Sequence, residues 1–377
     1  MTGKERVQAV LRGEETDAIP YGEYAIDSDT VEKVLGHETY LRAKAKTQIA
    51  LWEGRRDEVV QSLKEDIVAL YEKLDCLDIV NLMSEACGLV PPKDYVPLRP
   101  KKIREDTWED SQGRVYKFSP VTRDITMVHD PMLWEREYEP EDFPLYDILP
   151  PDESQFEVID HVIRRFRDEK YIIGYAGREA GFVLLGGMER GLTEYLSNPE
   201  GVQAAIDQAT ALGNQEDAYF IRPGQDAVFW GQDFAYNSGS LMAPKLFTQM
   251  VLPSVKQRVE NAKAHGVAVF KHCCGNTKDL RDFFLEAGYD CYQSLQKQAG
   301  MDLGQLRQLY GNQMCLWGGI DVANLIGGSR EQVRQETMEA IEIARQGGVI
   351  LGSSHSIATG CNYDNVMTMM ETIANHR

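Results

Sequence analysis

What the sequence lacks already narrows its function. Its 377 residues carry no excess of cationic side chains, since 40 Lys and Arg stand against 59 Asp and Glu, and the formal net charge is −19. A field of that sign repels nucleic-acid phosphates and anionic lipids, so nucleic acid and membrane surfaces are not expected partners. Apolar runs such as residues 182–188 fall far short of the roughly 20 residues that a membrane-spanning helix needs. A hydrophobic content of 43% is nevertheless enough for a full core, which excludes bulk disorder.

The sequence also lacks the marks of an exported protein. Its first twenty residues are charged and contain no apolar signal-peptide core. The seven cysteines are an odd number, scattered along a long chain, and are therefore expected to be reduced thiols. We expect a cytoplasmic protein in which some of these thiols are free to bind a metal.

What the sequence does contain is a repeated alternation of short apolar runs and amphipathic segments. Helical periodicity marks residues 243–265, 277–287 and 330–345 between such runs. This alternation predicts a parallel sheet covered by helices, and eight units close most naturally into a (β/α)8 barrel. A doubly wound open sheet is the alternative, but no GxGxxG follows the first run. The predicted strands are residues 18–24, 78–83, 171–176, 227–231, 268–273, 289–295, 314–320 and 349–353.

Two segments depart from this alternation. Thr2 and Glu5 form a capping-box pattern that predicts an N-terminal helix ending near Gly13. Residues 95–130 are rich in Thr, Val, Tyr and Trp around a turn at residues 110–113, which predicts a β-hairpin insertion. The expected fold is α/β: a (β/α)8 TIM barrel with an N-terminal helical extension and this insertion, in a single domain over residues 1–377.

Side chains with useful chemistry gather at the ends of the predicted strands, where barrel enzymes place their active sites. His272 and Cys274 alternate along the fifth strand, so they point to the same side, and imidazole and thiolate are both zinc ligands. Alone, such a pair more often means a buried thiol beside a hydrogen-bonded histidine. Cys361, just after the eighth strand, adds a third donor across the barrel mouth. Three protein ligands with one open position are typical of catalytic zinc.

Five further segments follow one another along the chain: KERVQAVLRGEETDAIPYG, WGQDFAYNSGSLMAPKLFTQMVLPSVKQRV, KHCCGNTKDL, LWGGID and CNYDNVMTMM. In this order they are similar to landmarks of the uroporphyrinogen decarboxylase superfamily. The resemblance covers residues 4–372 and implies a (β/α)8 barrel. The superfamily has two main branches: the haem-pathway decarboxylase and zinc methyltransferases that exchange methyl groups with corrinoid proteins.

The His-x-Cys…Cys set separates the two branches. It resembles the zinc motif of methylcobalamin:coenzyme M methyltransferases, which implies that His272, Cys274 and Cys361 bind zinc. The decarboxylase needs no metal and has an arginine-rich segment after its first strand, which binds a substrate with eight carboxylates. This chain has no arginine between Arg12 and Arg42. The Asp-x-His-x-x-Gly signature of corrinoid domains is also absent, so a separate corrinoid protein is the expected partner that supplies methylcobalamin.

Other residues at the strand ends have two readings each. Asp233 and Asp321 are expected to act in catalysis by orienting a ligand or the substrate, although each could instead cap the following helix. Tyr24 and Gln293 are expected to bind substrate, with a packing or hydrogen-bonding role as the alternative. His355 is more typical of a satisfied histidine than of a fourth ligand.

Two positions depart from the family pattern. Many relatives have Asp-Asp where this chain has Gln232-Asp233, which leaves the role of the first position open. Cys273 is an extra thiol beside the motif, and we expect it to pack outward from the barrel.

The sequence therefore predicts a zinc-dependent methyltransferase that moves a methyl group between a corrinoid protein and a small substrate. Two alternatives remain: a decarboxylase of the uroporphyrinogen type, and a non-catalytic protein that binds a tetrapyrrole or corrinoid. The direction of transfer and the small substrate are not specified, and a homo-oligomer is compatible with the sequence.

Overall fold

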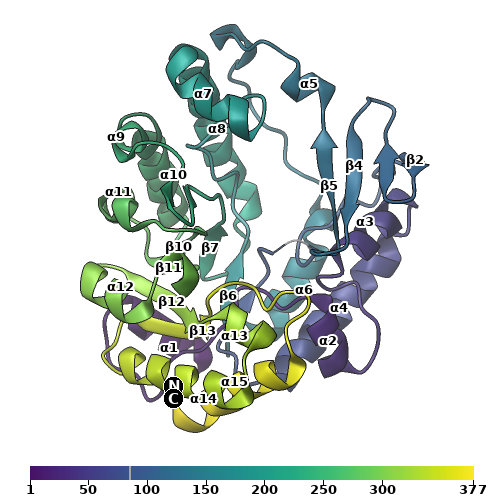
Figure 1. The fold of residues 1–377 in the computed structure, drawn as a ribbon. Helices are drawn as coiled ribbons and strands as arrows, with labels where there is room; N and C mark the ends of the chain where they lie inside the picture. The colour runs from purple at the N-terminus through teal and green to yellow at the C-terminus, as the bar shows by residue number, and fades with distance from the viewer. Residues whose placement is uncertain (85) are drawn as a thin grey trace.

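The centre of the computed structural model, which describes residues 1–84 and 86–377, is a parallel sheet curled into a barrel (Figure 1). Seven strands pair in the order β1-β6-β7-β10-β11-β12-β13, and every pairing is parallel. They fall within seven of the eight predicted strands, which confirms those predictions. Their bounds are β1 (Ile79–Asn81), β6 (Tyr171–Gly174), β7 (Ala227–Trp230), β10 (Ala268–His272), β11 (Cys291–Gln293), β12 (Cys315–Ile320) and β13 (Val349–Ser353).

The remaining predicted strand, residues 18–24, closes the barrel without being a regular strand. The Gly22 N–H donates to the Leu351 carbonyl in β13 at 3.0 Å, and the Asp78 N–H donates to the Tyr21 carbonyl at 2.7 Å. The ladder is irregular because Pro20 has no N–H and the Tyr21 N–H donates to the Asp78 carboxylate at 2.9 Å. All eight positions of a (β/α)8 barrel are therefore filled, as the sequence predicts.

Two apolar clusters stabilise the barrel, one inside it and one outside it. Inside it, apolar side chains from alternate strand positions pack on one another, and α1 (Gly3–Leu11), with its predicted capping box, covers the N-terminal end with Val7 and Val10. Outside it, the strands pack against a ring of helices. The helices of the chain include α4 (Arg56–Lys73), α6 (Glu157–Phe166), α7 (Met188–Ser197), α8 (Pro199–Phe220), α10 (Leu252–Ala264), α11 (Arg281–Ala287), α12 (Leu303–Tyr310), α14 (Arg330–Ala344) and α15 (Tyr363–His376).

The predicted helix over residues 243–265 is interrupted. It starts as α9 (Pro244–Leu246), continues as the short π-helix η3 (Phe247–Val251) and then becomes α10. The Leu252 N–H donates to the Phe247 carbonyl five residues earlier, and Pro253 cannot donate at all, so regular α-helical bonding is lost at this point. The predicted helices over residues 277–287 and 330–345 are confirmed as α11, preceded by a short 3-10 turn, and as α14.

The insertion is larger than the predicted hairpin. It forms a four-stranded antiparallel sheet from β2 (Lys101–Arg104), β3 (Thr107–Glu109), β4 (Val115–Ser119) and β5 (Asp124–His129). Asp110 makes the predicted turn by accepting from the N–H groups of Gln112 and Arg114. Figure 1 shows this sheet beside α3 (Lys44–Trp52), where the Trp52 ring lies 5.7 Å from that of Trp108. The remaining α-helices are α2 (Ser28–Leu35), α5 (Pro131–Trp134) and α13 (Val322–Gly327).

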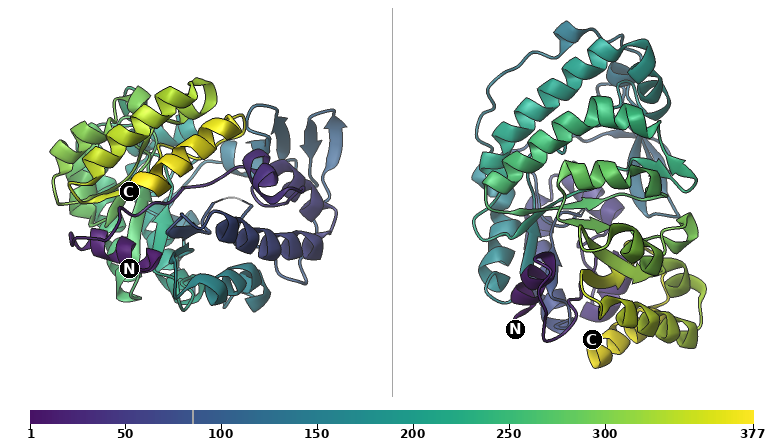
Figure 2. Two further views of the ribbon diagram at one scale, coloured as in Figure 1. Left: turned by 90° about the horizontal axis from the view of Figure 1, so that it is seen from below. Right: turned by 90° about the vertical axis from the view of Figure 1, so that its left-hand side faces the viewer.

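The two chain ends lie at the same end of the molecule (Figure 2). This is the end from which the strands start, because α1 packs against β1, β6 and β13, and Arg377 Nη1 at the chain end donates to Asp78 Oδ2, just before β1, at 2.6 Å. Within residues 1–84 and 86–377, no helix is long and apolar enough to cross a membrane.

Candidate metal centre

The candidate site is built around His272, the last residue of β10. Its partner in register is Gln293, the last residue of β11, so the two side chains start from adjacent positions at the carboxyl ends of neighbouring strands. His272 Nδ1 is in hydrogen-bond contact with the Oε1 atom of Gln293. The Tyr24 ring stacks on the imidazole with centroids 4.6 Å apart and planes 19° apart. Both predicted substrate-binding residues therefore lie in the site, where they contact the histidine.

Two further donor atoms lie beside the imidazole. The Cys274 thiol is 3.2 Å from His272 Nε2, as expected for alternate residues that point to the same side. The ligand atoms of His272, Cys274 and His355 all lie within 4.8 Å of one another. Imidazole and thiolate are the donors that zinc prefers, and three of them leave one tetrahedral position open. This donor set fits a zinc ion.

The loop after β10 is shaped to present the Cys274 thiol. The Cys274 N–H donates to Asp233 Oδ1 at 2.7 Å, so the predicted catalytic carboxylate holds the backbone of a candidate ligand. Gly275 has a φ of +84°, and a Cβ atom there would lie 2.5 Å from the Tyr236 carbonyl oxygen. Only glycine fits this turn. Ser294 Oγ donates to the thiol at 3.4 Å.

Cys361 is not part of this group of donors among the residues that the structure describes. It lies on the loop after β13, six residues beyond His355, and the residue is only 3% exposed in the outer core, the apolar cluster between the strands and the surrounding helices. The same loop is tied to the N-terminal segment, because Asp27 accepts from the Thr359 N–H and Asp29 from the Gly360 N–H. His355, which sequence reasoning set aside, is the third donor near the pair. Its signal was its place directly after a strand.

Burial sets the protonation of the donor atoms. It lowers the pKa of His272 to about 4, so the imidazole is neutral and keeps a lone pair at neutral pH. It also lowers the pKa of His355. For Cys274, burial and then the Asp233 charge raise the pKa to about 12, so the metal-free site holds a thiol. A metal ion that binds here has to displace that proton.

The other predicted residues have structural contacts. Asp321 caps α13, because its Oδ1 accepts from the Ala323 N–H at 3.0 Å, which is the helix-capping alternative. Cys273 packs outward as expected: it is fully buried in the outer core, and its sulfur accepts from the Phe234 N–H. The predicted role of Asp321 in catalysis has no support from these contacts.

A buried ion pair, which sequence reasoning missed, lies outside the barrel and holds the backbone next to the site. Lys271 is fully buried, and its Nζ contacts Glu179 and donates to the Gln232 carbonyl at 2.6 Å. Glu179 in turn accepts from the Gln232 N–H at 2.8 Å. Burial raises the pKa of Glu179, while the Lys271 charge opposes that rise. The pair fixes the backbone immediately before Asp233, and through it the Cys274 loop.

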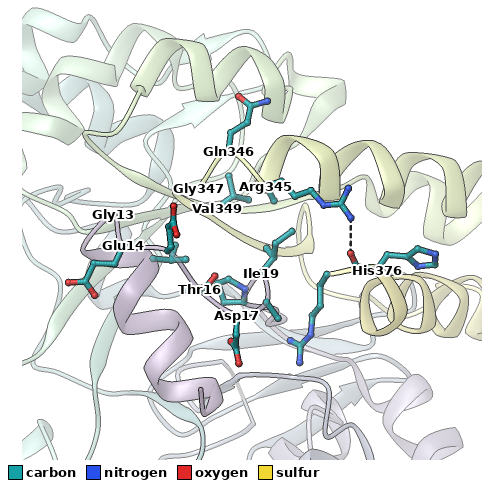
Figure 3. Close-up of a pocket in the computed structure, with 16 residues that line it drawn as sticks. Gly13, Glu14, Thr16, Asp17, Ile19, Arg345, Gln346, Gly347, Val349 and His376 are labelled. Carbon is teal, nitrogen blue, oxygen red and sulfur yellow. Dashed lines mark hydrogen bonds between the residues drawn. The ribbon is translucent and has the colours of Figure 1, made fainter.

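A hollow of about 520 Å³ lies at the opposite end of the barrel (Figure 3). It is bordered by residues 13–20, by Val349 at the start of β13 and by the end of α15, where Arg345 donates to the His376 carbonyl at 3.2 Å. Val349 starts β13, whereas His355 of the donor group follows the end of that strand. The length of β13 therefore separates this hollow from the candidate metal centre.

Comparison with known proteins places the chain in a family. The family model described as Uroporphyrinogen decarboxylase (URO-D) matches residues 131–376, and the chain belongs to this family. Among solved structures, a methyltransferase from Methanosarcina mazei has a TM-score of 0.68 at 16% identity, over 100% of this chain and 99% of that one. A protein assigned as a vitamin-B12 independent methionine synthase from Listeria monocytogenes has a TM-score of 0.46 at 10% identity, over 96% and 98% of the two chains. No curated protein matches.

Proposed function

We propose that this member of the family is a zinc-dependent methyltransferase that moves a methyl group between a corrinoid, carried by a separate protein, and a small substrate bound at the metal. The observation that carries the proposal is the His272–Cys274 pair at the barrel mouth, with a third donor within 4.8 Å. The similarity to the Methanosarcina mazei methyltransferase supports the proposal through its fold. We also propose that residues 1–377 act as one domain in the cytoplasm.

The proposed ligands are His272, Cys274 and one donor from the loop after β13. The motif implies Cys361 for that third position, whereas the geometry favours His355. A zinc ion in this set supplies a Lewis acid, which favours the thiolate form of a coordinated substrate thiol or activates a methyl ether or methylamine. His272 offers its lone pair without losing a proton, and Cys274 gives up one proton when metal binds. Asp233 holds Cys274 in place through its backbone.

A decarboxylase of the uroporphyrinogen type is the second candidate, because it gives the matched family its description. Such an enzyme has to bind many carboxylates, and guanidinium groups are the usual means. The segment from residue 13 to residue 41, which closes the barrel and carries Tyr24, contains no arginine. Turnover of uroporphyrinogen at about 1 per second or faster would favour this candidate over the first.

Metal analysis and an optical assay test the proposal together. We expect about one zinc ion per chain, as for a three-ligand catalytic site, and loss of that zinc in Cys274→Ala. With the zinc-loaded protein, we expect methylcobalamin to lose its methyl group to one of a panel of thiols, or cob(I)alamin to gain one from methyl ethers or methylamines. Comparing His355→Ala with Cys361→Ala identifies the third ligand. Wild-type protein without zinc, or zinc-loaded protein that transfers no methyl group with any corrinoid protein supplied, would contradict the proposal.

A further inference from the structure

The imidazole of His272 is held on three sides before any metal binds. Tyr24 covers one face of the ring, Gln293 Oε1 contacts Nδ1, and the Cys274 thiol lies 3.2 Å from Nε2. The two ring nitrogens therefore have different neighbours. One faces an amide oxygen, and the other faces the candidate metal site.

We infer that Gln293 is a positioning residue, which holds His272 in the Nδ1–H tautomer and so directs the Nε2 lone pair at the metal site. An amide oxygen can only accept, so the ring nitrogen that contacts it must carry the proton. A neutral imidazole has one N–H, and its lone pair is then on Nε2, beside Cys274. Histidines that bind metals usually donate their other N–H in this way. The inference deepens the proposed function and rests on it, because it assigns the partner that orients a proposed zinc ligand.

The surroundings of Gln293 favour a positioning role over a purely stabilising one. Its side chain is fully buried between β10 and β12, and within residues 1–84 and 86–377 its Nε2 amide group has no hydrogen-bond partner. Burying an amide donor without a partner costs free energy, and an apolar side chain of similar size would avoid that cost. The contact that the side chain does make is the one from Oε1 to His272. A role in orienting the histidine explains why the amide is kept there.

The direct test is the tautomer of His272 in metal-free protein. Nitrogen-15 labelling of the histidines and NMR distinguish an Nδ1–H ring from an Nε2–H ring, and a His272→Gln spectrum assigns the signal. We expect the Nδ1–H form in wild type and in Gln293→Glu, which keeps an oxygen acceptor. In Gln293→Leu and Gln293→Met the acceptor is gone, so we expect the Nε2–H form to appear.

Zinc affinity, measured by competition with a chelator, gives the second readout. We expect Gln293→Leu to bind zinc about 10- to 100-fold more weakly, as is usual when the partner of a metal-ligating histidine is removed, and Gln293→Glu to restore the affinity. The matched control is Gln225→Leu. Gln225 is also buried, but its amide bonds to Arg222 and Tyr175, so this variant should lose stability without losing zinc affinity.

The two proposals fail in different ways. An Nε2–H tautomer in wild type, or folded Gln293→Leu and Gln293→Met variants with unchanged tautomer and zinc affinity, would overturn the role of Gln293 even if the protein binds zinc and transfers methyl groups. A wild-type protein that binds no zinc but shows the Nδ1–H tautomer, which is lost in Gln293→Leu, would overturn the proposed function and leave the orientation of His272 by Gln293 established.

Discussion

The two ends of the barrel are built from the same strands but carry opposite kinds of side chain. In β10 and β11 the inward positions hold Phe270 and Cys291, which belong to an apolar interior cluster with Cys315 of β12. Two residues further along the same strands, the same face holds His272 and Gln293, whose polar atoms contact each other. The apolar level of Phe270 and Cys291, here called the lower layer, stabilises the barrel. The polar level of His272 and Gln293, here called the upper layer, lies where barrel enzymes have their active sites.

The cysteines show that position decides what a thiol can do. Cys291 and Cys315 are register partners on neighbouring strands, and burial raises the pKa of Cys291 well above its usual range. They lie in the apolar layer with no histidine. Cys274 is half-buried and lies beside an imidazole nitrogen, a serine hydroxyl and the His355 ring. Two thiols side by side are therefore packing residues in one layer, while a single thiol is a candidate ligand in the other.

The largest expected effect concerns the ion pair between Lys271 and Glu179, next to the upper layer. Replacing Lys271 by Met leaves Glu179 buried without its partner, so we expect about 3–5 kcal/mol of destabilisation. The double variant Lys271→Met with Glu179→Gln removes both charges and should recover most of that loss. Urea unfolding of the two variants and the wild type measures the effect. A Lys271→Met variant as stable as wild type would show that the ion pair is not what holds the Gln232 backbone.

A second buried carboxyl makes stability depend on pH. Glu23 is 2% exposed and accepts from the Tyr21 hydroxyl at 2.8 Å and from the Ser353 N–H at 3.1 Å, yet burial raises its pKa to about 7. Between its ordinary pKa of 4.5 and 7 the folded state holds the proton that the unfolded state has lost. Stability therefore falls as the pH rises through this range, by about 3 kcal/mol in all.

The variant Glu23→Gln isolates this contribution, because an amide does not titrate. We expect its stability relative to wild type to increase by about 3 kcal/mol between pH 4.5 and pH 8. Unfolding at several pH values measures this difference directly, since the other carboxylates are common to both proteins. A difference that stays constant with pH would mean that Glu23 is ionised throughout, as an ordinary glutamate is.

The smallest effect concerns Asp321, where packing and chemistry can be told apart. The structure shows it as the cap of α13, so Asp321→Ala should cost about 1 kcal/mol of stability and Asp321→Asn much less. Neither substitution should change zinc affinity or methyl transfer. A variant of normal stability with reduced transfer would restore the catalytic role that the sequence indicates.

The sequence predicted what depends on local pattern. Apolar runs located seven regular strands, and the alternation of His272 and Cys274 placed both side chains on one side. The sequence could not predict the pairing of His272 with Gln293, because this contact depends on the register between β10 and β11. His355 has no spacing partner that marks it as a donor, and Lys271 looks like a surface residue until the position of Glu179 is known. The irregular closure at residues 19–22 depends in the same way on a distant side chain, that of Asp78.

The most direct test of the account compares a thiol from each layer. Zinc content and methyl transfer from methylcobalamin to a thiol panel should be measured for wild type, Cys274→Ala and Cys291→Ala, with the melting temperature as the check on folding. We expect Cys274→Ala to fold and to lose both zinc and transfer, while Cys291→Ala loses some stability but keeps its zinc. Equal zinc retention in the two variants would contradict the claim that the mouth of the barrel, at His272 and Cys274, is the metal centre.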